Sequence, residues 1–340
     1  MCNRNIVVAV AVAVSLAVAG LAFAIPAVPG PSGYHIRKTI PLGGTEGWDY
    51  ISMDSSSRRL YIGRQTHMDV VDVDSGTVVA TLTGMPGVHG IALVPEFGLG
   101  FTVEENDTTS ILDLNTLKII GALKMGKDPD SYAYDELTKR VFVMNSAGAS
   151  ATAIDAAKGA IVGTVAFDGQ PEFVASDGKG KIFVNITDKN QILEFDGQSL
   201  QVLQHWSLAP CEGPSGLSID RKNRRLFSAC DNQMMIVMNA ETGKVIASLP
   251  TGAGSDASLF DPDTGNAFAS AGGAGTLTVI HEDSPDKFRV VEDVRTQSGA
   301  RTMALDKKTH NVLLVTARHG HGSTHLDVLP DTFVVLVVGK

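Results

Sequence analysis

The chain has 340 residues, of which 44% are hydrophobic and 19% are charged, and its formal net charge at pH 7 is −9. This composition is typical of a folded globular protein with a sizeable buried core. The excess of acidic residues argues against a nucleic-acid partner and against anionic membrane surfaces, because both normally require a basic face. We therefore expect neither a nucleic acid nor, after processing, a membrane among its partners.

The first 24 residues have the pattern of a secretory signal peptide. Arg4 provides a positive start, residues 6–20 are almost wholly apolar, and Ala22–Ala24 is an A-x-A cleavage pattern. Removal of this segment changes the net charge from −9 to −10, because it carries Arg4. The alternative is an uncleaved membrane anchor, since the apolar run nearly reaches spanning length. Residues 25–33 are rich in Pro and Gly and predict a flexible leader.

A repeat of about 42 residues, within the range of propeller blades, runs seven times through the rest of the chain. Each copy begins with a short apolar segment that ends in Asp, except the second copy, where Val94 stands in that place. The terminal Asp residues are Asp54, Asp135, Asp177, Asp220, Asp261 and Asp306. The shared position gives a common register in which equivalent residues of all seven copies can be compared.

Three further strands are predicted after each of these segments. In the first copy they cover residues 59–63, 70–74 and 77–82, and the other copies follow the same order. The runs are rich in β-branched residues and are bounded by Gly, Asp, Asn and Pro, which is the strand signature. No window shows a sustained helical period. Repeats of this length with four short strands are β-propeller blades.

The two ends of the chain complete the count of strands. The last copy ends after a third strand at residues 332–339, whereas residues 35–42, before the first copy, read like a fourth strand. Pairing of these two segments would complete the last blade and protect its edges. The predicted fold is all-β: a single seven-bladed β-propeller of four-stranded antiparallel blades over residues 34–340, which we expect to be a monomer.

The repeated sequence pattern of strand and turn resembles that of a known family. Residues 71–78, 140–145 and 237–245 are similar to the YVTN repeats of the YncE-like β-propeller family of exported bacterial proteins. The resemblance covers essentially the whole chain after residue 24 and implies a WD40-like propeller that is periplasmic or secreted. It implies no catalytic residue, because no catalytic motif of lactonase-type propellers can be matched here residue by residue.

Two cysteines, Cys211 and Cys230, remain after signal cleavage. The first lies just before the first strand of the fifth repeat and the second at the end of its second strand, so both lie at the same end of adjacent strands. Export to an oxidising compartment favours a disulfide between them. The alternative is a pair of free thiols or of metal ligands.

One position of the repeat collects polar side chains. It lies five residues before each terminal position, where the chain enters the strand that would line the central channel. Its occupants are Asp49, His89, Asp130, Glu172, Ser215, Asp256 and Arg301. Crowded carboxylates raise one another's pKa or recruit a cation, and hard oxygen ligands suit Ca²⁺ or Mg²⁺. Arg301 could instead receive a carboxylate or phosphate. The alternative is a polar channel that only holds ordered water.

A second group of candidate ligands is formed by histidines. His319, His321 and His325 lie in a long insertion of the seventh repeat, and His67 lies in the equivalent loop of the first. Imidazoles at such spacing can bind Zn²⁺ or Cu²⁺. The Gly-rich loop is too flexible to form a site in advance, which favours a solvated surface loop.

No nucleophile elbow, His-Glu-x-x-His motif or phosphate-binding loop occurs. The sequence therefore favours a non-enzymatic binding or scaffold module that holds a small molecule or a periplasmic protein at the channel mouth. The alternative is a metal-dependent hydrolase of lactonase type. In that case Asp49, Asp130, Glu172 and Asp256 would hold a divalent cation (Ca, Zn or Cu), and His89 would be the general base.

Overall fold

The computed structural model describes residues 30–320 and 328–340. The predicted signal peptide (1–24), the first part of the predicted leader (25–29) and the candidate ligands His321 and His325 lie outside these ranges. Regular structure in the described residues is almost entirely β. Two short 3-10 helices, η1 (Pro95–Phe97) and η2 (Thr187–Lys189), complete it. Within the described residues, no helix has the length and apolar character needed to cross a membrane.

The strands form six antiparallel sheets, five with four strands and one with seven. The seven-stranded sheet contains β2 (Ile51–Asp54), β3 (Arg59–Gly63), β4 (Gln65–Asp72), β5 (Thr77–Val94), β6 (Leu99–Glu104), β7 (Thr108–Asp113) and β8 (Lys118–Lys124). The next sheet contains β9 (Pro129–Asp135), β10 (Arg140–Asn145), β11 (Ser150–Asp155) and β12 (Ala160–Ala166). It is followed by β13 (Pro171–Ser176), β14 (Lys181–Ile186), β15 (Gln191–Asp196) and β16 (Val202–Ser207).

The remaining three sheets follow in chain order. The first of them has β17 (Pro214–Asp220), β18 (Arg225–Cys230), β19 (Met234–Asn239) and β20 (Val245–Pro250). The second has β21 (Ser255–Asp261), β22 (Asn266–Ala271), β23 (Thr276–Ser284) and β24 (Lys287–Arg295). The last has β25 (Met303–Asp306), β26 (Asn311–Thr316), β27 (Val334–Gly339) and β1 (His35–Pro41).

The first two repeats share one sheet because β5 is continuous. It pairs with β4 from Thr77 to Val88 and with β6 from Val88 to Val94. The last strand of the first repeat therefore becomes the first strand of the second, where the sequence predicted two separate strands.

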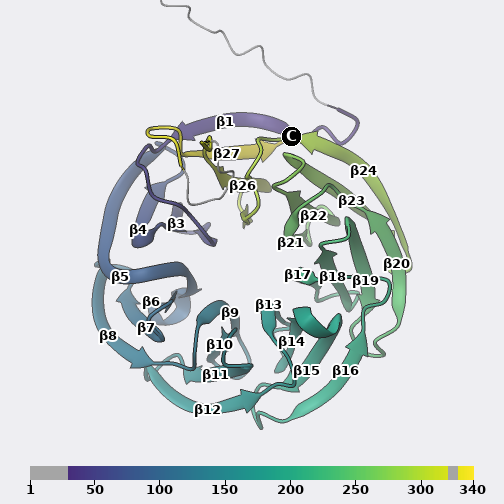
Figure 1. Ribbon diagram of the computed structural model, residues 1–340, viewed down its shortest axis with the longest axis horizontal. Coiled ribbons are helices and arrows are strands. Elements are labelled where there is room, and N and C mark those ends of the chain that lie inside the picture. The colour runs from purple at the N-terminus through teal and green to yellow at the C-terminus, as the bar shows by residue number, and fades with distance from the viewer. Residues whose placement is uncertain (1–29, 321–327) are drawn as a thin grey trace, which may run out of the picture.

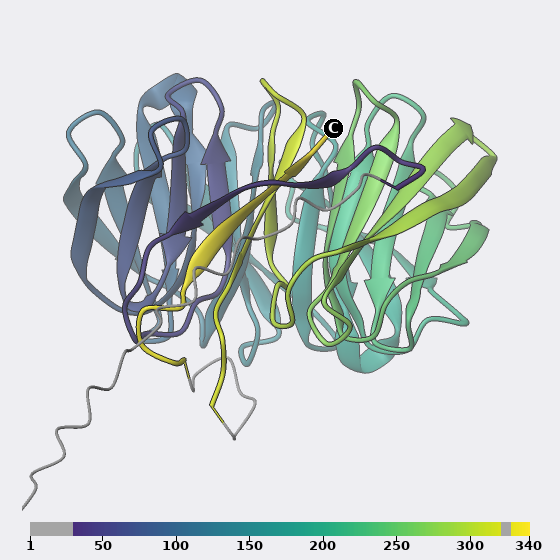
Figure 2. The same ribbon diagram turned by 90° about the horizontal axis from the view of Figure 1, so that it is seen from above.

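The N-terminal strand completes the last sheet, as the sequence predicted. β1 pairs antiparallel with β27 from His35↔Gly339 to Pro41↔Val334. Figure 2 shows the two strands crossing the side of the molecule together. Two distant segments of the chain are thus held in one sheet, and the outer edge of β27 is covered.

The sheets are arranged around a common centre, with the first strand of each repeat innermost (Figure 1). Each innermost strand contacts the next, and β25 contacts β2. The core lies between neighbouring sheets, where the second strands bury one large side chain at an equivalent position. These side chains are Tyr61, Phe101, Phe142, Phe183, Phe227 and Phe268, each at most 1% exposed. Sheet-to-sheet packing therefore sets where the ends of the inner strands meet.

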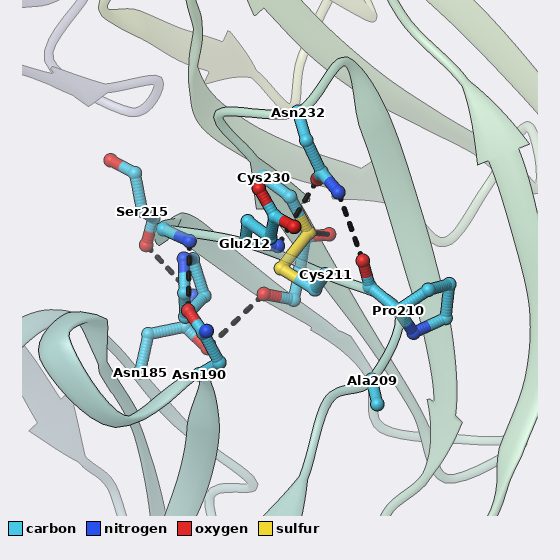
Figure 3. Close-up of a disulfide and its surroundings, with 12 residues drawn as sticks. Asn185, Asn190, Ala209, Pro210, Cys211, Glu212, Ser215, Cys230 and Asn232 are labelled. Atoms are coloured by element: carbon cyan, nitrogen blue, oxygen red, sulfur yellow. Dashed lines mark hydrogen bonds between the residues drawn. A yellow bond between two sulfur atoms is a disulfide. The ribbon is translucent and has the colours of Figure 1, made fainter.

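Cys211 and Cys230 form the predicted disulfide, with their Cα atoms 5.6 Å apart. The bond joins the loop before β17 to the end of β18 (Figure 3). Asn232 supports the same loop, since its amide donates to the carbonyl oxygen of Pro210 at 2.9 Å and its Oδ1 accepts from the backbone of Glu212 at 3.1 Å. The free-thiol and metal-ligand alternatives for these cysteines are excluded.

The last residues of the predicted leader are anchored to the domain. The backbone N–H and the hydroxyl of Ser32 donate to Oε2 of Glu292, at 2.9 and 2.6 Å. This contact places residues 30–33 against β24.

Candidate functional site

The seven equivalent polar residues lie where the inner strands begin. Asp130, Glu172, Ser215 and Asp256 are in β9, β13, β17 and β21, and His89 is in β5. Asp49 and Arg301 lie two residues before β2 and β25. We call this set, Asp49, His89, Asp130, Glu172, Ser215, Asp256 and Arg301, the channel-mouth ring.

Backbone irregularities coincide with the ring. The register with the second strand shifts between Val88 and Gly90, around His89, and again where Asp130, Glu172, Ser215 and Asp256 lie. A β-bulge bends a strand and redirects a side chain, and bulges are over-represented next to functional sites. The irregularity recurs in five repeats and turns the same position toward the shared mouth.

Ion pairs and hydrogen bonds connect most of the ring. Nδ1 of His89 donates to Oδ2 of Asp49 at 2.7 Å. Arg301 bridges two acids, with NH2 at 3.2 Å from Oδ1 of Asp49 and NH1 at 2.8 Å from Oδ2 of Asp256. Oγ of Ser215 donates to Oδ1 of Asp256 at 2.9 Å. Residues from blades far apart in the sequence thus form one connected network.

Asp130 and Glu172 take little part in this network. Oδ2 of Asp130 accepts only a long hydrogen bond, at 3.5 Å, from the hydroxyl of Tyr50, and its Oδ1 lies 3.8 Å from Nδ1 of His89. Burial, and then the charge of Asp49, raise the pKa of Asp130 from 3.8 to about 7. Burial, and then the charges of Asp130 and Asp256, raise the pKa of Glu172 from 4.5 to about 9. Glu172 is therefore protonated at neutral pH in the unliganded ring, whereas Asp130 exchanges its proton near pH 7.

His89 is held in its charged form. Burial alone would lower the pKa of its imidazole, but the hydrogen bond to Asp49 and the charges of Asp49 and Asp130 outweigh burial and raise the pKa from 6.5 to about 9. A general base near neutrality needs an unprotonated imidazole. The role of general base that the hydrolase hypothesis assigned to His89 is therefore disfavoured.

An aromatic layer lies directly below one side of the ring. Tyr50 packs edge-on against Phe173 and Tyr132, with ring centroids 5.0 and 6.1 Å apart. The hydroxyl of Tyr132 lies 2.8 Å from Oγ of Ser52. Tyr50 directly follows Asp49, Phe173 directly follows Glu172, and Tyr132 lies two residues after Asp130, so the aromatic layer is next to these carboxyls along the inner strands.

The structure brings together only some of the predicted metal ligands. Ligand atoms of Asp49, His89 and Asp130 lie within 4.8 Å of one another, which is a spacing that one ion could bridge. Glu172 and Asp256 are not part of that group. Another such group, Asp261, Asp263 and His310, lies at the opposite ends of the strands and had not been predicted. There, His310 and Thr264 donate to Asp261, which joins two sheets.

The two histidines of the predicted loop site that lie in the described residues contact different neighbours. Nε2 of His67 lies 3.5 Å from Oδ2 of Asp69, and its Nδ1 lies 3.0 Å from Oγ1 of Thr66. The ring of His319 packs on Trp48, with ring centroids 5.4 Å apart. Among the described residues, neither belongs to a cluster of possible metal ligands.

A large cavity opens beside the ring. Its volume is about 950 Å³, and it lies between the loops of the fifth, sixth and seventh repeats. Its walls include two members of the ring, Asp256 and Arg301, and also Asp231, Ser255, His319 and Leu329. A smaller cavity of about 120 Å³ lies across the ring, between Asp49, His89 and Glu105. Asp231 was missed by the sequence analysis, although it follows a second strand and so lies in a loop on this face.

The sequence matches no protein-family model and no curated protein. Solved structures do match. Kuenenia stuttgartiensis hydrazine synthase has a TM-score of 0.72 at 14% identity, covering 86% of this chain and 96% of that chain. The WD40 repeats of RRP9 have a TM-score of 0.74 at 8% identity, covering 89% of this chain and 97% of that chain.

A chain of a mitotic checkpoint complex gives a TM-score of 0.72 at 11% identity, covering 89% of this chain and 94% of that chain. The chain has a WD40-like β-propeller fold. At these identities the likeness concerns the fold alone, and the propeller's function has to be argued from its site.

Proposed function

We propose that this β-propeller binds a positively charged ligand through the channel-mouth ring and does not transform it chemically. The proposal depends on the balance of charge in the ring. Four carboxyl groups face one imidazolium and one guanidinium, so full ionisation would leave two negative charges uncompensated. Without a ligand this excess is reduced by a proton on Glu172 and, below about pH 7, by a second proton on Asp130. A bound cation would replace those protons.

The proposal includes the architecture and location expected from the sequence. We infer a closed ring of seven blades in which the seven-stranded sheet counts as two, since β5 serves both. We further infer export to the periplasm or the cell exterior, which is supported by the pattern of residues 1–24 and by the Cys211–Cys230 disulfide. The proposed relationship to the YncE-like proteins rests on the sequence of the repeats.

The second candidate function is a metal-dependent hydrolase. It is favoured by one observation, the convergence of Asp49, His89 and Asp130 within the reach of a single ion. A divalent cation there would polarise a bound carbonyl and would compete with the proton of His89. The remaining difficulty is the base, because His89 is already bonded to Asp49.

Metal analysis and thermal unfolding of the exported protein test both functions. We expect Ca²⁺, Zn²⁺ or an organic cation to raise Tm, and Asp130→Asn to reduce the rise. Asp74→Asn, an acid-to-amide change of an exposed side chain at the opposite ends of the strands, is the control and should leave the rise intact. The binding function is contradicted if no inorganic or organic cation binds. Sustained turnover of lactones or esters, lost in Asp130→Asn, would establish the hydrolase instead.

A further inference from the structure

The large cavity is continuous with the ring, since Asp256 and Arg301 belong to both. Its volume of about 950 Å³ lies within the usual range of small-molecule sites, roughly 300–1,000 Å³. A single metal ion at Asp49, His89 and Asp130 would leave this space unused. The shape of the site therefore points to a ligand with a body as well as a charge.

A buried hydroxyl in the cavity wall lacks a partner. Ser255 is 2% exposed, and its Oγ makes no hydrogen bond to any residue in the described part of the chain. It directly precedes Asp256 at the start of β21 and lines the cavity. A buried polar atom without a partner is costly, and a hydroxyl can accept from an ammonium N–H. A donor bound at this wall would remove that cost.

Asp231 supplies a second acidic pole, away from the channel. It lines the cavity and forms no ion pair with any described Lys, Arg or His. Partial burial, and then the charge of Asp256, raise the pKa of Asp231. Like Glu172 on the other side of the Arg301–Asp256 pair, it is a carboxyl group without a compensating cation.

Resting on the proposed cation-binding function, we propose that the ligand is a linear aliphatic diamine or polyamine. One ammonium group lies at the ring end of the cavity, where Asp256 lines the wall and Glu172 is a neighbouring carboxyl of the ring. A second ammonium lies beside Asp231 and Ser255. The methylene chain between them crosses the cavity along the Arg301–Asp256 pair and contacts Ala317 and Leu329, which are apolar members of the wall.

Calorimetric titration of the exported protein with putrescine, n-butylamine and CaCl₂ separates the possibilities. Putrescine should bind more tightly than n-butylamine, which carries one ammonium group only. Asp231→Asn should weaken putrescine binding by about tenfold or more, the usual scale for one hydrogen bond to a charged group, and leave n-butylamine and Ca²⁺ unchanged. Asp74→Asn is the matched control and should change none of the three.

The outcomes distinguish a failure of the diamine proposal from a failure of the proposed cation-binding function. Equal affinity for the two amines, or an Asp231→Asn variant that binds putrescine as the parent does, overturns the diamine. Binding of Ca²⁺ without either amine overturns the diamine and leaves the cation site standing. If none of the three binds, the proposed function itself fails. Should Asp231→Asn not fold, Ser255→Ala replaces it, and it must weaken putrescine selectively.

Discussion

Arg58 and Asp306 join the first repeat to the last. NH1 of Arg58 donates to both carboxylate oxygens of Asp306, at 2.8 and 2.7 Å, and the Asp306 side chain is only 2% exposed. Arg58 stands in a turn of the first repeat with a φ of 62°. A contact between residues 248 apart in the sequence therefore holds β25 beside β2.

The same contact recurs between other neighbouring blades. Asp177 pairs with Arg224 at 2.9 Å, and Asp261 accepts from His310 at 3.1 Å. Arg224 and His310 occupy the turn position of Arg58, with φ values of 59° and 58°. The recurrent Asp is thus more than the end of a strand, because it fixes the next blade.

Asp306→Asn should lower the free energy of unfolding by about 3 kcal/mol, because it removes one partner of a buried ion pair. Chemical denaturation measures the change. Arg58 also pairs with Asp74, and the Asp74 side chain is 62% exposed. Asp74→Asn should therefore lower the free energy of unfolding by less than about 1 kcal/mol. Equal effects of the two substitutions would contradict this account of how β25 is held beside β2.

The Asp306 contact should also be lost in acid. Burial would raise the pKa of Asp306, but hydrogen bonds from Arg58 and Thr309 outweigh it and hold the pKa below 3.8. The stabilisation is present above the pKa of the unfolded chain and disappears as pH falls through the lower, folded value. The stability difference between the parent protein and Asp306→Asn should therefore shrink below about pH 4.

Glu172→Gln should stabilise the unliganded protein at alkaline pH. The unfolded chain releases this proton near pH 4.5, whereas the folded ring keeps it to about 9, so stability falls as pH rises between these values. At about 1.4 kcal/mol per pKa unit, we expect a gain of at least about 1 kcal/mol at pH 8 and none at pH 4. Calorimetry at the two pH values measures it, with exposed Glu212→Gln as the control.

The imidazole of His89 should remain protonated at pH 8. Its folded pKa of about 9 exceeds the unfolded value of 6.5, so its stabilisation is complete below 6.5 and is lost as pH rises through 9. Asp49→Asn removes the charge that raises the pKa of His89 and leaves only a weaker, neutral acceptor for its N–H, so burial should then bring this pKa below 7. NMR titration of the imidazole protons of His89 measures this pKa in the parent protein and in the variant. Deprotonation near 6.5 in the parent would revive His89 as a general base.

Binding of a cation at pH 8 should release protons. Glu172 is protonated there in the unliganded ring, and a nearby positive charge favours its ionised form. Titrations in two buffers of different ionisation enthalpy give the number released, which should approach one per bound cation. Glu172→Gln should abolish the release.

Loss of the Cys211–Cys230 bond should destabilise the domain. The bond spans 19 residues, for which loop-closure entropy gives about 3 kcal/mol. The double Cys→Ser variant should unfold at correspondingly lower denaturant. An unchanged midpoint would mean that residues 211–230 are already constrained in the unfolded chain.

The repeat alone determined much of this protein. The strands, their antiparallel order, the pairing of the N-terminal strand with the last sheet and the nearness of the two cysteines all follow from local patterns. The alternation of apolar and polar residues and the turn residues act over a few positions, so the register of the repeats can be seen in the sequence. That register also selected Asp49, His89, Asp130, Glu172, Ser215, Asp256 and Arg301.

The tertiary structure decided what those residues do to one another. Which acids are paired with Arg301 and His89, and which are left to hold protons, depends on side-chain directions set by bulges and on burial between blades. The Arg58–Asp306 contact and the cavity, whose wall runs from Asp231 to Leu329, also join residues far apart in the sequence. The Asp and the turn residue that meets it recur in the sequence, but which pairs form, and where loops enclose a cavity, depends on how neighbouring blades pack.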